Sequence, residues 1–302
     1  MYHIVYGLLY LISLLPMGVI HAISSSIAWL VGSVVGYRWN IVMSNLAIAF
    51  PEKTEKERRA IAREFYQNFT DALLESIKLI SMSDEEVGRR FLGDSSEVMN
   101  KLMEDGSGRN LQLHAMHNFN WEYAHLGVVK GLRHPFLGVY GPISNPILEK
   151  IFYDIRSRFG TVLIPAPKFR TNFKDYAGDR YILALVADQS PSGPARSWWI
   201  DFFGRRTGWV TGPESGARLK NVKVIFGTFF KVKRGYYSFD FRMPSKDPRD
   251  MQEGELTAEY VQYVEECVRK RPANYLWSHR RWKHAYKDEY APLVIRRKDQ
   301  SS

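Results

Sequence analysis

His117 and Glu122, five positions apart, are the residues in this sequence whose types and spacing best suit proton-transfer chemistry. An apolar run, Leu111–Met116, ends just before them and is predicted to be a buried strand, and a helical stretch begins at Asn120. If His117 lies in the turn and Glu122 in the first helical turn, the carboxylate can fold back to one ring nitrogen. It would fix the imidazole tautomer, so that the other nitrogen can take a proton from a hydroxyl group near neutral pH. The alternative is a polar turn in which His117 or Asn118 only caps the helix.

The strand before His117 belongs to a longer alternation of apolar runs and helical stretches. Six runs are predicted to be strands: Leu111–Met116, Phe136–Tyr140, Thr161–Ile164, Tyr181–Ala187, Val222–Thr228 and Tyr236–Met243. Five stretches are predicted to be helices: Asn120–Val129, Asn145–Phe159, Asn172–Ala177, Gly212–Leu219 and Thr257–Lys270. We therefore expect an α/β fold with a mixed, largely parallel sheet flanked by helices, closed by an antiparallel hairpin at Lys233–Gly235. Upstream, Thr54 and Glu57 have the spacing of a capping box that begins a long helix.

The first 37 residues contain no Asp, Glu, Lys or Arg. Within them, Ile4–Ile20 is almost wholly apolar, although Pro16 interrupts it, and its seventeen residues reach the lower limit for crossing a hydrocarbon core of ~30 Å. A second apolar run, Ile23–Val35, is predicted either to lie in the membrane interface or to complete a hairpin. This segment predicts a membrane anchor.

The positive charges that follow the apolar segment indicate its orientation. No Lys or Arg precedes Arg38, which argues against a secretory signal peptide, because such peptides begin with positive charge. Basic residues come later, at Lys53 and Lys56 among others, so the positive-inside rule keeps the body of the protein in the cytoplasm. We predict an anchor over residues 1–37 and a single domain over residues 38–302.

The formal net charge of +10 favours anionic partners, which include acidic lipid headgroups, an acidic carrier protein and nucleic acid. The aromatic content suits a membrane–water boundary, but it also suits single-stranded nucleic acid, so composition alone does not decide. The segment Ser190–Gly212 departs from the strand–helix rhythm and is rich in Trp, Phe and Arg. Because loops of this length are often functional, it is predicted to touch lipid or to line an apolar groove.

Several other patterns have ordinary structural explanations. Glu214 and Arg218 have the i, i+4 spacing of a surface ion pair worth ~0.3–0.5 kcal/mol, although Arg218 could instead meet a headgroup phosphate. The lone Cys267 excludes an intrachain disulfide and is predicted to be a half-buried structural thiol. The sequence has no Gly-x-Ser-x-Gly elbow, no P-loop, no Gly-x-Gly-x-x-Gly and no convincing metal-ligand spacing.

The stretch His117-Asn-Phe-Asn-Trp-Glu122 resembles the His-x4-Asp/Glu motif of the lysophospholipid, glycerolipid and lipid A acyltransferase superfamily. The chain is similar to its lipid A late-acyltransferase (lauroyl/myristoyl) branch in several further blocks, which occur in the same order: Arg38–Pro51, Asn145–Lys150, Arg156–Gly160, Val186–Ser190, Phe202–Gly204, Thr211–Pro213 and Tyr275–Lys283. It lacks the Pro-Glu-Gly-Thr-Arg block of the related phospholipid enzymes, which argues against a glycerol-phosphate acceptor. Several blocks in order are more specific than one His-x4-Glu pair.

The resemblance implies an O-acyltransferase that moves a fatty-acyl chain from a thioester to a hydroxyl group of a lipid A precursor-like glycolipid. His117 would be the general base and Glu122 would orient and polarise it, with direct attack and no acyl-enzyme. The resemblance places Asp188 and Gln189 in the site, and Arg156 and Arg218 are further candidates for substrate binding. Asp188 could orient a catalytic group, or it could be a polar strand end that bonds a neighbouring loop.

The resemblance also implies partners and location. The donor would be an acyl-carrier protein or a coenzyme A thioester, with no other cofactor and no metal, and the net positive charge would suit an acidic carrier. The enzyme would work on the cytoplasmic face of the bacterial inner membrane, on a membrane lipid at an anionic surface, without nucleic acid. The alternatives are an amino-acid lipid or lysophospholipid acceptor, or a non-catalytic basic protein that binds membranes or nucleic acid.

Overall fold

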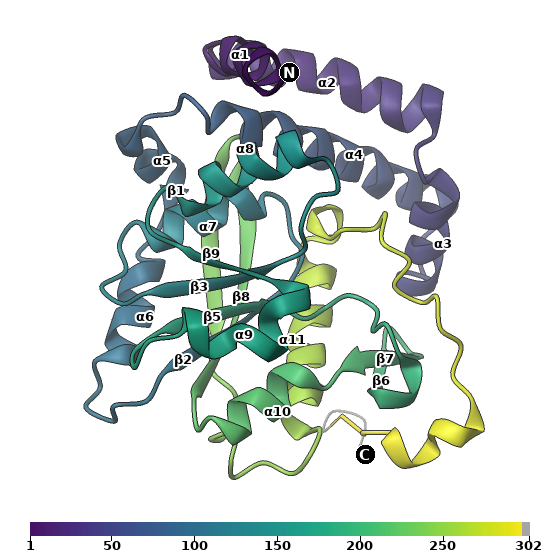
Figure 1. The fold of residues 1–302 in the computed structure, drawn as a ribbon. Coiled ribbons are helices and arrows are strands. Elements are labelled where there is room, and N and C mark those ends of the chain that lie inside the picture. The colour runs from purple at the N-terminus through teal and green to yellow at the C-terminus, as the bar shows by residue number, and fades with distance from the viewer. Residues whose placement is uncertain (298–302) are drawn as a thin grey trace.

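A computed structural model describes residues 1–297, so the last five residues of the predicted domain lie outside the described part of the chain. Within that part, a seven-stranded sheet has the strand order β1-β9-β8-β2-β5-β3-β4 (Figure 1). All neighbouring strands run parallel except β8 and β9, which form an antiparallel hairpin. The predicted mixed, largely parallel sheet and its final hairpin are confirmed.

The strands of the main sheet are β1 (Phe91–Leu92), β2 (Leu111–Ala115), β3 (Phe136–Tyr140), β4 (Val162–Pro165), β5 (Ile182–Val186), β8 (Lys223–Lys233) and β9 (Tyr236–Arg242). The helices are α1 (Tyr2–Ser13), α2 (Met17–Trp29), α3 (Trp39–Ala49), α4 (Glu55–Lys78), α5 (Asp84–Arg90), α6 (Ser95–Met103), α7 (Trp121–Val129), α8 (Pro146–Ser157), α9 (Ala166–Tyr176), α10 (Gly212–Leu219) and α11 (Glu255–Lys270). Thr54 caps α4 in the predicted capping box with Glu57.

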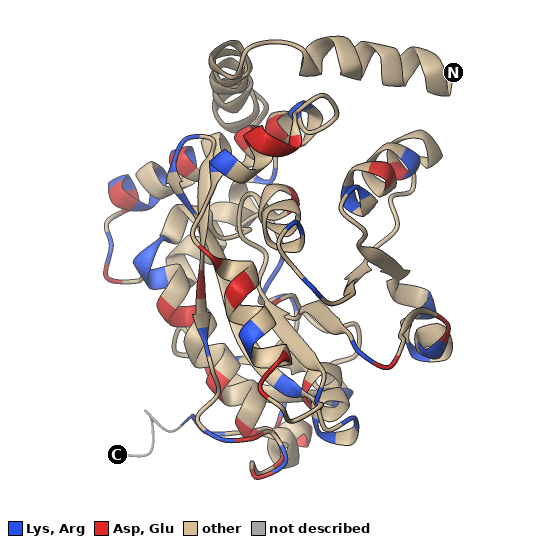
Figure 2. Ribbon diagram, turned by 90° about the vertical axis from the view of Figure 1, so that its left-hand side faces the viewer, with Lys and Arg blue, Asp and Glu red and all other residues tan. Residues whose placement is uncertain are grey.

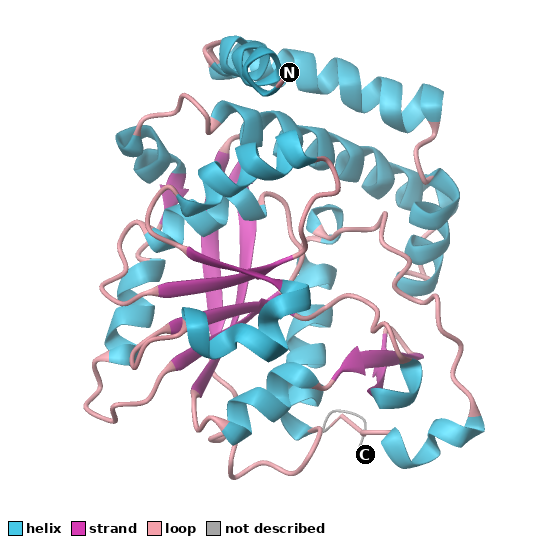
Figure 3. Cartoon of the chain, in the orientation of Figure 1, coloured by secondary structure: helices cyan, strands magenta, loops and turns pink. Residues whose placement is uncertain are grey.

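Strand β2 lies between β5 and β8, and all five of its residues are buried. Helices cover both faces of the sheet (Figure 3), so successive β2 side chains enter two separate cores. Leu113 packs in a core with α5, α6 and α7, whereas His114 faces Tyr260 of α11 on the other side. The two polar residues of β2, Gln112 and His114, are buried as well, and their side chains hydrogen-bond each other.

Pro16 divides the N-terminal apolar segment into two helices, α1 and α2. The run Ile4–Ile20, whose length reaches the lower limit for a crossing, is therefore not one continuous helix. A π-helical turn, Leu30–Val35, continues α2, and together Met17–Val35 gives 19 residues that are long and apolar enough to cross a membrane. Figure 2 shows that these first helices carry no charged residue, in contrast to the rest of the fold.

Helix α2 lies along α4 (Figure 1). The side chains on its two sides differ in polarity. Ser24 is fully buried on the side that meets α4. On the open side, apolar residues such as Trp29 and Val35 are exposed, at 65% and 66%. The helix therefore turns polar groups toward the protein and apolar groups outward, the reverse of a helix on a water-exposed surface.

The segment Ser190–Gly212 forms a hairpin of β6 (Ser197–Phe202) and β7 (Arg205–Val210). Trp199 and Trp209 of this hairpin are fully buried. The prediction that its aromatic residues touch lipid is wrong for these side chains, because they complete a hydrophobic core with α11 and the C-terminal segment.

Candidate active site

His117 and Asp188 form a hydrogen-bonded pair just beyond the carboxyl ends of two neighbouring parallel strands, β2 and β5. The strands pair in register from Leu111 with Ile182 to Ala115 with Val186, so both chains leave the sheet together. Oδ1 of Asp188 lies 2.6 Å from Nδ1 of His117, and Oδ2 accepts a hydrogen bond from the His117 backbone N–H at 3.1 Å. Two bonds to one carboxylate fix both the loop and the imidazole ring.

The electrostatics of the pair keep Asp188 ionised. Burial alone raises the pKa of this carboxyl group, but the charge of His117, two hydrogen bonds from His117 and the charge of Arg281 outweigh burial. Its pKa therefore falls below the ordinary 3.8. A carboxylate can only accept, so Nδ1 carries the imidazole proton and Nε2 has a free lone pair. Asp188 is 1% exposed and His117 24%, which leaves the imidazole open to a substrate.

Glu122 does not orient the imidazole as predicted. It lies in the first turn of α7, 5% exposed, and its carboxylate is bound by the guanidinium group of Arg156 on α8. Nε of Arg156 lies 3.0 and 3.1 Å from the two carboxylate oxygens, and Nη2 lies 2.5 Å from Oε1. The correction has a simple cause: Asp188 already occupies Nδ1 of His117, and the helical start of α7 turns Glu122 toward α8. Its role in catalysis stays a prediction.

Trp121 lies between the two pairs. Its indole N–H donates to Oε1 of Glu122 at 3.1 Å, and its ring meets the His117 imidazole edge to face, with centroids 6.1 Å apart. Arg156 is also held over the rings of Tyr140 and Phe152, at 5.7 and 5.5 Å. Trp121 therefore contacts both His117 and Glu122, the residue that binds Arg156.

Three other histidines in the fold are neutral structural residues. Burial lowers the pKa of His114 to about 3 and of His125 to about 4. Burial and the charge of Arg281 lower the pKa of His279 to about 4, and its Nε2 accepts a hydrogen bond from the backbone N–H of Ser190. These contacts leave His117 as the better candidate for a base.

The remaining predicted binding residues lie in different places. Gln189 is half-buried and directly follows Asp188. Arg218 is in the last turn of α10, just before β8, whose Lys223 pairs with Leu111 at the start of β2. It is therefore at the opposite edge of the sheet from His117, on the order of 15 Å away along a five-residue strand at ~3.3 Å per residue. This placement argues against substrate binding by Arg218.

The predicted i, i+4 ion pair of Arg218 with Glu214 is present at 4.0 Å, but it is not a surface pair, because Glu214 is buried. Glu214 is 2% exposed and accepts hydrogen bonds from Gly254 N and Thr257 N at the start of α11. Arg218 donates to the carbonyl oxygen of Met251 at 2.7 Å, and its distance from Glu214 is 4.0 Å. Glu214 therefore caps a helix that is distant in sequence.

Arg281 has a role that the sequence did not indicate. It is buried, at 2% exposed. Its Nη1 donates to the carbonyl oxygen of Gly208 at 3.0 Å, and its guanidinium group stacks 4.1 Å from the centroid of the Trp209 ring. Through its charge it stabilises the ionised form of Asp188. Its neighbours Arg280 and Lys283 are exposed.

A cavity of about 410 Å³ lies between α3 and the C-terminal segment. Its lining combines apolar and polar residues with three basic side chains: Asn40, Ile41, Ser44, Asn45, Ile48, Arg205, Arg280, Trp282 and Lys283. The chain that follows Asp188 contacts one lining residue, because the hydroxyl group of Ser190 donates to the carbonyl oxygen of Arg280 at 3.0 Å. It is suited to an anionic group.

The chain is similar to known proteins along most of its length. Residues 1–284 match the family described as bacterial lipid A biosynthesis acyltransferase. The chain is 25% identical over 281 residues to a lipid A biosynthesis lauroyltransferase of Escherichia coli, covering 92% of this chain and 89% of the relative. It is 28% identical over 289 residues to a lipid A biosynthesis acyltransferase of Haemophilus influenzae, covering 93% and 89%. A lipid A biosynthesis palmitoleoyltransferase of Escherichia coli is 24% identical over 283 residues, covering 92% and 89%.

Proposed function

Because the chain belongs to the bacterial lipid A biosynthesis acyltransferase family and is an acyltransferase, we propose that it acylates a hydroxyl group of a lipid A precursor-like membrane glycolipid. The observation that carries the mechanism is the His117–Asp188 pair, in which a buried carboxylate holds an accessible imidazole with Nε2 free. The donor in this proposal is a fatty-acyl thioester.

In the proposed reaction, Nε2 of His117 removes the proton from the acceptor hydroxyl group while its oxygen attacks the thioester carbonyl carbon. A carbon–oxygen bond forms and the carbonyl oxygen becomes an oxyanion. When the oxyanion collapses, the carbon–sulfur bond breaks, and the imidazolium Nε2–H returns its proton to the departing sulfur. No acyl-enzyme is formed. Asp188 keeps Nδ1 protonated throughout and stabilises the imidazolium.

For Glu122 and Arg156 we propose an electrostatic role, in place of the predicted orientation of His117 by Glu122. Glu122 holds the Arg156 guanidinium group with three contacts, so the cation is rigid before substrate arrives. A preorganised positive charge close to a developing oxyanion is an effective form of catalysis in a site that excludes water. We assign this electrostatic function to Arg156, with Glu122 as the residue that positions it.

The substrates fit the surface around the pair. Acyl-carrier protein is the proposed donor, because it is acidic and the chain has a net charge of +10. The basic cavity beside Ser190 suits an anionic group on either substrate. The apolar helix Met17–Val35 supports association with the bacterial inner membrane, with the domain on the cytoplasmic side. An amino-acid lipid or lysophospholipid acceptor would use the same chemistry.

The test is acyl transfer by the purified full chain in detergent or lipid vesicles, with an acyl-carrier protein thioester and a lipid A precursor. Lipid mass spectrometry should show a mass gain of one ester-linked acyl chain. His117→Ala should abolish the gain without changing membrane association, whereas His3→Ala, which alters an exposed histidine, should leave it intact. Retention of transfer by His117→Ala would refute the mechanism, and no product from the wild-type chain would refute the substrate assignment.

A further inference from the structure

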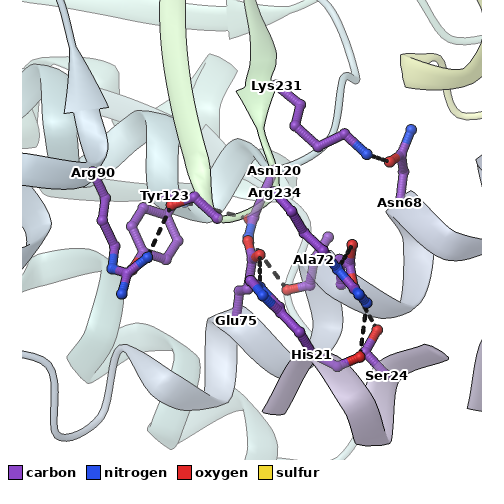
Figure 4. Close-up of polar contacts among 12 residues, drawn as sticks. His21, Ser24, Asn68, Ala72, Glu75, Arg90, Asn120, Tyr123, Lys231 and Arg234 are labelled. Atoms are coloured by element: carbon purple, nitrogen blue, oxygen red, sulfur yellow. Dashed lines mark hydrogen bonds and ion pairs between the residues drawn. The ribbon is translucent and has the colours of Figure 1, made fainter. Parts of the chain in front are cut away.

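A buried group of polar side chains connects the N-terminal apolar helices to the loop that carries His117 (Figure 4). Glu75 of α4 is at its centre and is fully buried. Its Oε1 accepts a hydrogen bond from Nε2 of His21 on α2 at 2.9 Å. Its Oε2 accepts two more, from Nδ2 of Asn120 at 3.1 Å and from the hydroxyl group of Tyr237 on β9 at 2.6 Å. One carboxylate thus joins three separate elements.

Asn120 lies between His117 and Glu122 in the chain and is 1% exposed. Its Oδ1 accepts the backbone N–H of Tyr123 at 3.4 Å and so caps α7, the helix that bears Glu122. Its Nδ2 faces Glu75. The Asn120 side chain is therefore fixed at both ends, and its position determines where the His117 turn ends and where α7 begins.

We propose that Glu75 is a positioning residue for acyl transfer. It holds Asn120, and through Asn120 the turn from His117 to Glu122, and it links this turn by way of His21 to α2. Helix α2 is then part of the scaffold of the active site in addition to its contact with the membrane. The inference rests on the proposed function and goes beyond it, because neither Glu75 nor His21 belongs to the motifs of the site.

The energetics of burial support a positioning role. A carboxylate removed from water costs several kcal/mol unless hydrogen bonds compensate, and an apolar side chain of similar size often gives equal or greater stability. Stability alone therefore gives little reason for an acid at position 75. Burial, and then the negative charge of Glu75, raises the pKa of Tyr237 well above its ordinary value, so its hydroxyl group stays a donor. The carboxylate of Glu75 accepts hydrogen bonds from three side chains in fixed directions, which is what a positioning role requires.

Asp71, one turn earlier on α4, provides a matched control. It is 1% exposed, and its carboxylate accepts from Ser24 of α2 at 2.6 Å and from Arg234 at 2.7 and 3.0 Å. In the described part of the chain, its side-chain bonds go to α2, to the β8–β9 turn and to Gln67 of its own helix. Asp71 thus fastens α2 to the domain as Glu75 does, but without a bond to the catalytic loop.

The first experiment compares Glu75→Met, Glu75→Gln and Asp71→Asn in the full chain. Glu75→Met should lower kcat for acyl transfer by about tenfold or more with KM within about twofold, since a small misplacement of a catalytic group is costly. Glu75→Gln keeps acceptors for Asn120 and Tyr237 and should stay within about threefold of the wild type. Asp71→Asn should keep kcat within about twofold, whatever its effect on the melting temperature.

A second experiment addresses the contact itself and does not depend on the folding of Glu75→Met. Asn120→Asp retains a helix-capping oxygen but sets two carboxylates against each other, so kcat should fall by about tenfold. Adding Glu75→Gln restores the hydrogen bond in the opposite direction, with the amide at position 75 as donor and the carboxylate at position 120 as acceptor. The double variant should therefore recover most of the lost kcat. A residue with only a structural role would not give this reciprocal rescue.

Three results would overturn the proposal: wild-type kcat in folded Glu75→Met, failure of Glu75→Gln to rescue Asn120→Asp, or an equal loss of kcat in Asp71→Asn and Glu75→Met. In each case the wild-type chain still transfers acyl groups, so the proposed function stands. A wild-type chain without acyl transfer would overturn the proposed function and this inference with it.

Discussion

The carboxylate of Asp188 binds His117 twice, through the backbone N–H at 3.1 Å and through Nδ1 at 2.6 Å. The two residues are 71 positions apart, and the backbone bond fixes the loop while the side-chain bond fixes the ring. Asp188 therefore controls both the place of the imidazole and the nitrogen that carries its proton. The first two predictions depend on this double contact.

Asp188→Asn should lower kcat by about 10³–10⁴-fold, because an amide can donate to Nδ1 and so favour the wrong imidazole tautomer. The fold should persist, since the amide oxygen can still accept the His117 backbone N–H. Steady-state acyl transfer and circular dichroism measure the two effects. Activity within tenfold of the wild type would show that Asp188 does not orient the base.

The lowered pKa of Asp188 also predicts a pH dependence of stability. A carboxyl group whose folded-state pKa lies below its unfolded value stabilises the fold above the unfolded pKa, and this contribution is lost as pH falls through the folded pKa. The wild type should therefore lose stability on acidification below about pH 4 more steeply than Asp188→Asn does. Urea midpoints measured between pH 6 and 3 test this, and parallel pH profiles would contradict it.

Removing one partner of the Glu122–Arg156 ion pair should strongly destabilise the fold. The two side chains are 6% and 16% exposed, so Arg156→Met leaves a buried, unpaired carboxylate and should destabilise the fold by about 3–5 kcal/mol. The double variant Glu122→Gln/Arg156→Met removes both charges and should regain stability but not acyl transfer. Denaturant unfolding and kcat separate these outcomes; recovery of activity in the double variant would remove the electrostatic role of Arg156.

Arg218→Ala should retain near-wild-type kcat and KM, because Arg218 lies at the opposite edge of the sheet from His117. A modest loss of stability is expected from the lost bond to the Met251 carbonyl oxygen, about 0.5–1.5 kcal/mol. Kinetics with the lipid acceptor and thermal unfolding measure both. A large rise in KM would restore Arg218 as a substrate-binding residue.

Cys267 should be chemically inert. It is half-buried on α11 as predicted, and burial raises the pKa of its thiol to about 11, so the reactive thiolate is scarce near neutral pH. Cys267→Ala should transfer acyl groups at the wild-type rate, and iodoacetamide at pH 7.5 should inactivate the native enzyme slowly. Acyl label trapped on this thiol during turnover would contradict direct attack.

Much of the architecture was predictable from local patterns. The alternation of buried strands and helices indicated the parallel sheet, since strands that helices cover on both faces are mostly apolar. The capping box at Thr54 was readable because its two partners are three residues apart. The strand end at Leu111–Ala115 correctly placed His117 at the carboxyl edge of the sheet.

The errors arose where distant segments meet. Glu122 is near His117 in the chain, but the partner of the imidazole is Asp188, which follows another strand. A local sequence pattern does not indicate which distant residues lie close together in the fold. Glu214 was read as half of a surface pair because its local spacing fits one, whereas a buried helix start at Gly254 takes its carboxylate. Trp209 looked like a lipid contact because the core that covers it comes from segments distant in sequence, among them α11.

Asp188 and His117 each stand just outside a strand whose register is fixed by five consecutive pairings with the other. A slip of one residue would turn every side chain of β5 to the opposite face and carry the acid away from the ring. The spacing of the two groups is thus set by the main chain and not by the surrounding loops. Loops and helices around the site could therefore change to accept another chain length or sugar while the proton-transfer unit keeps its dimensions.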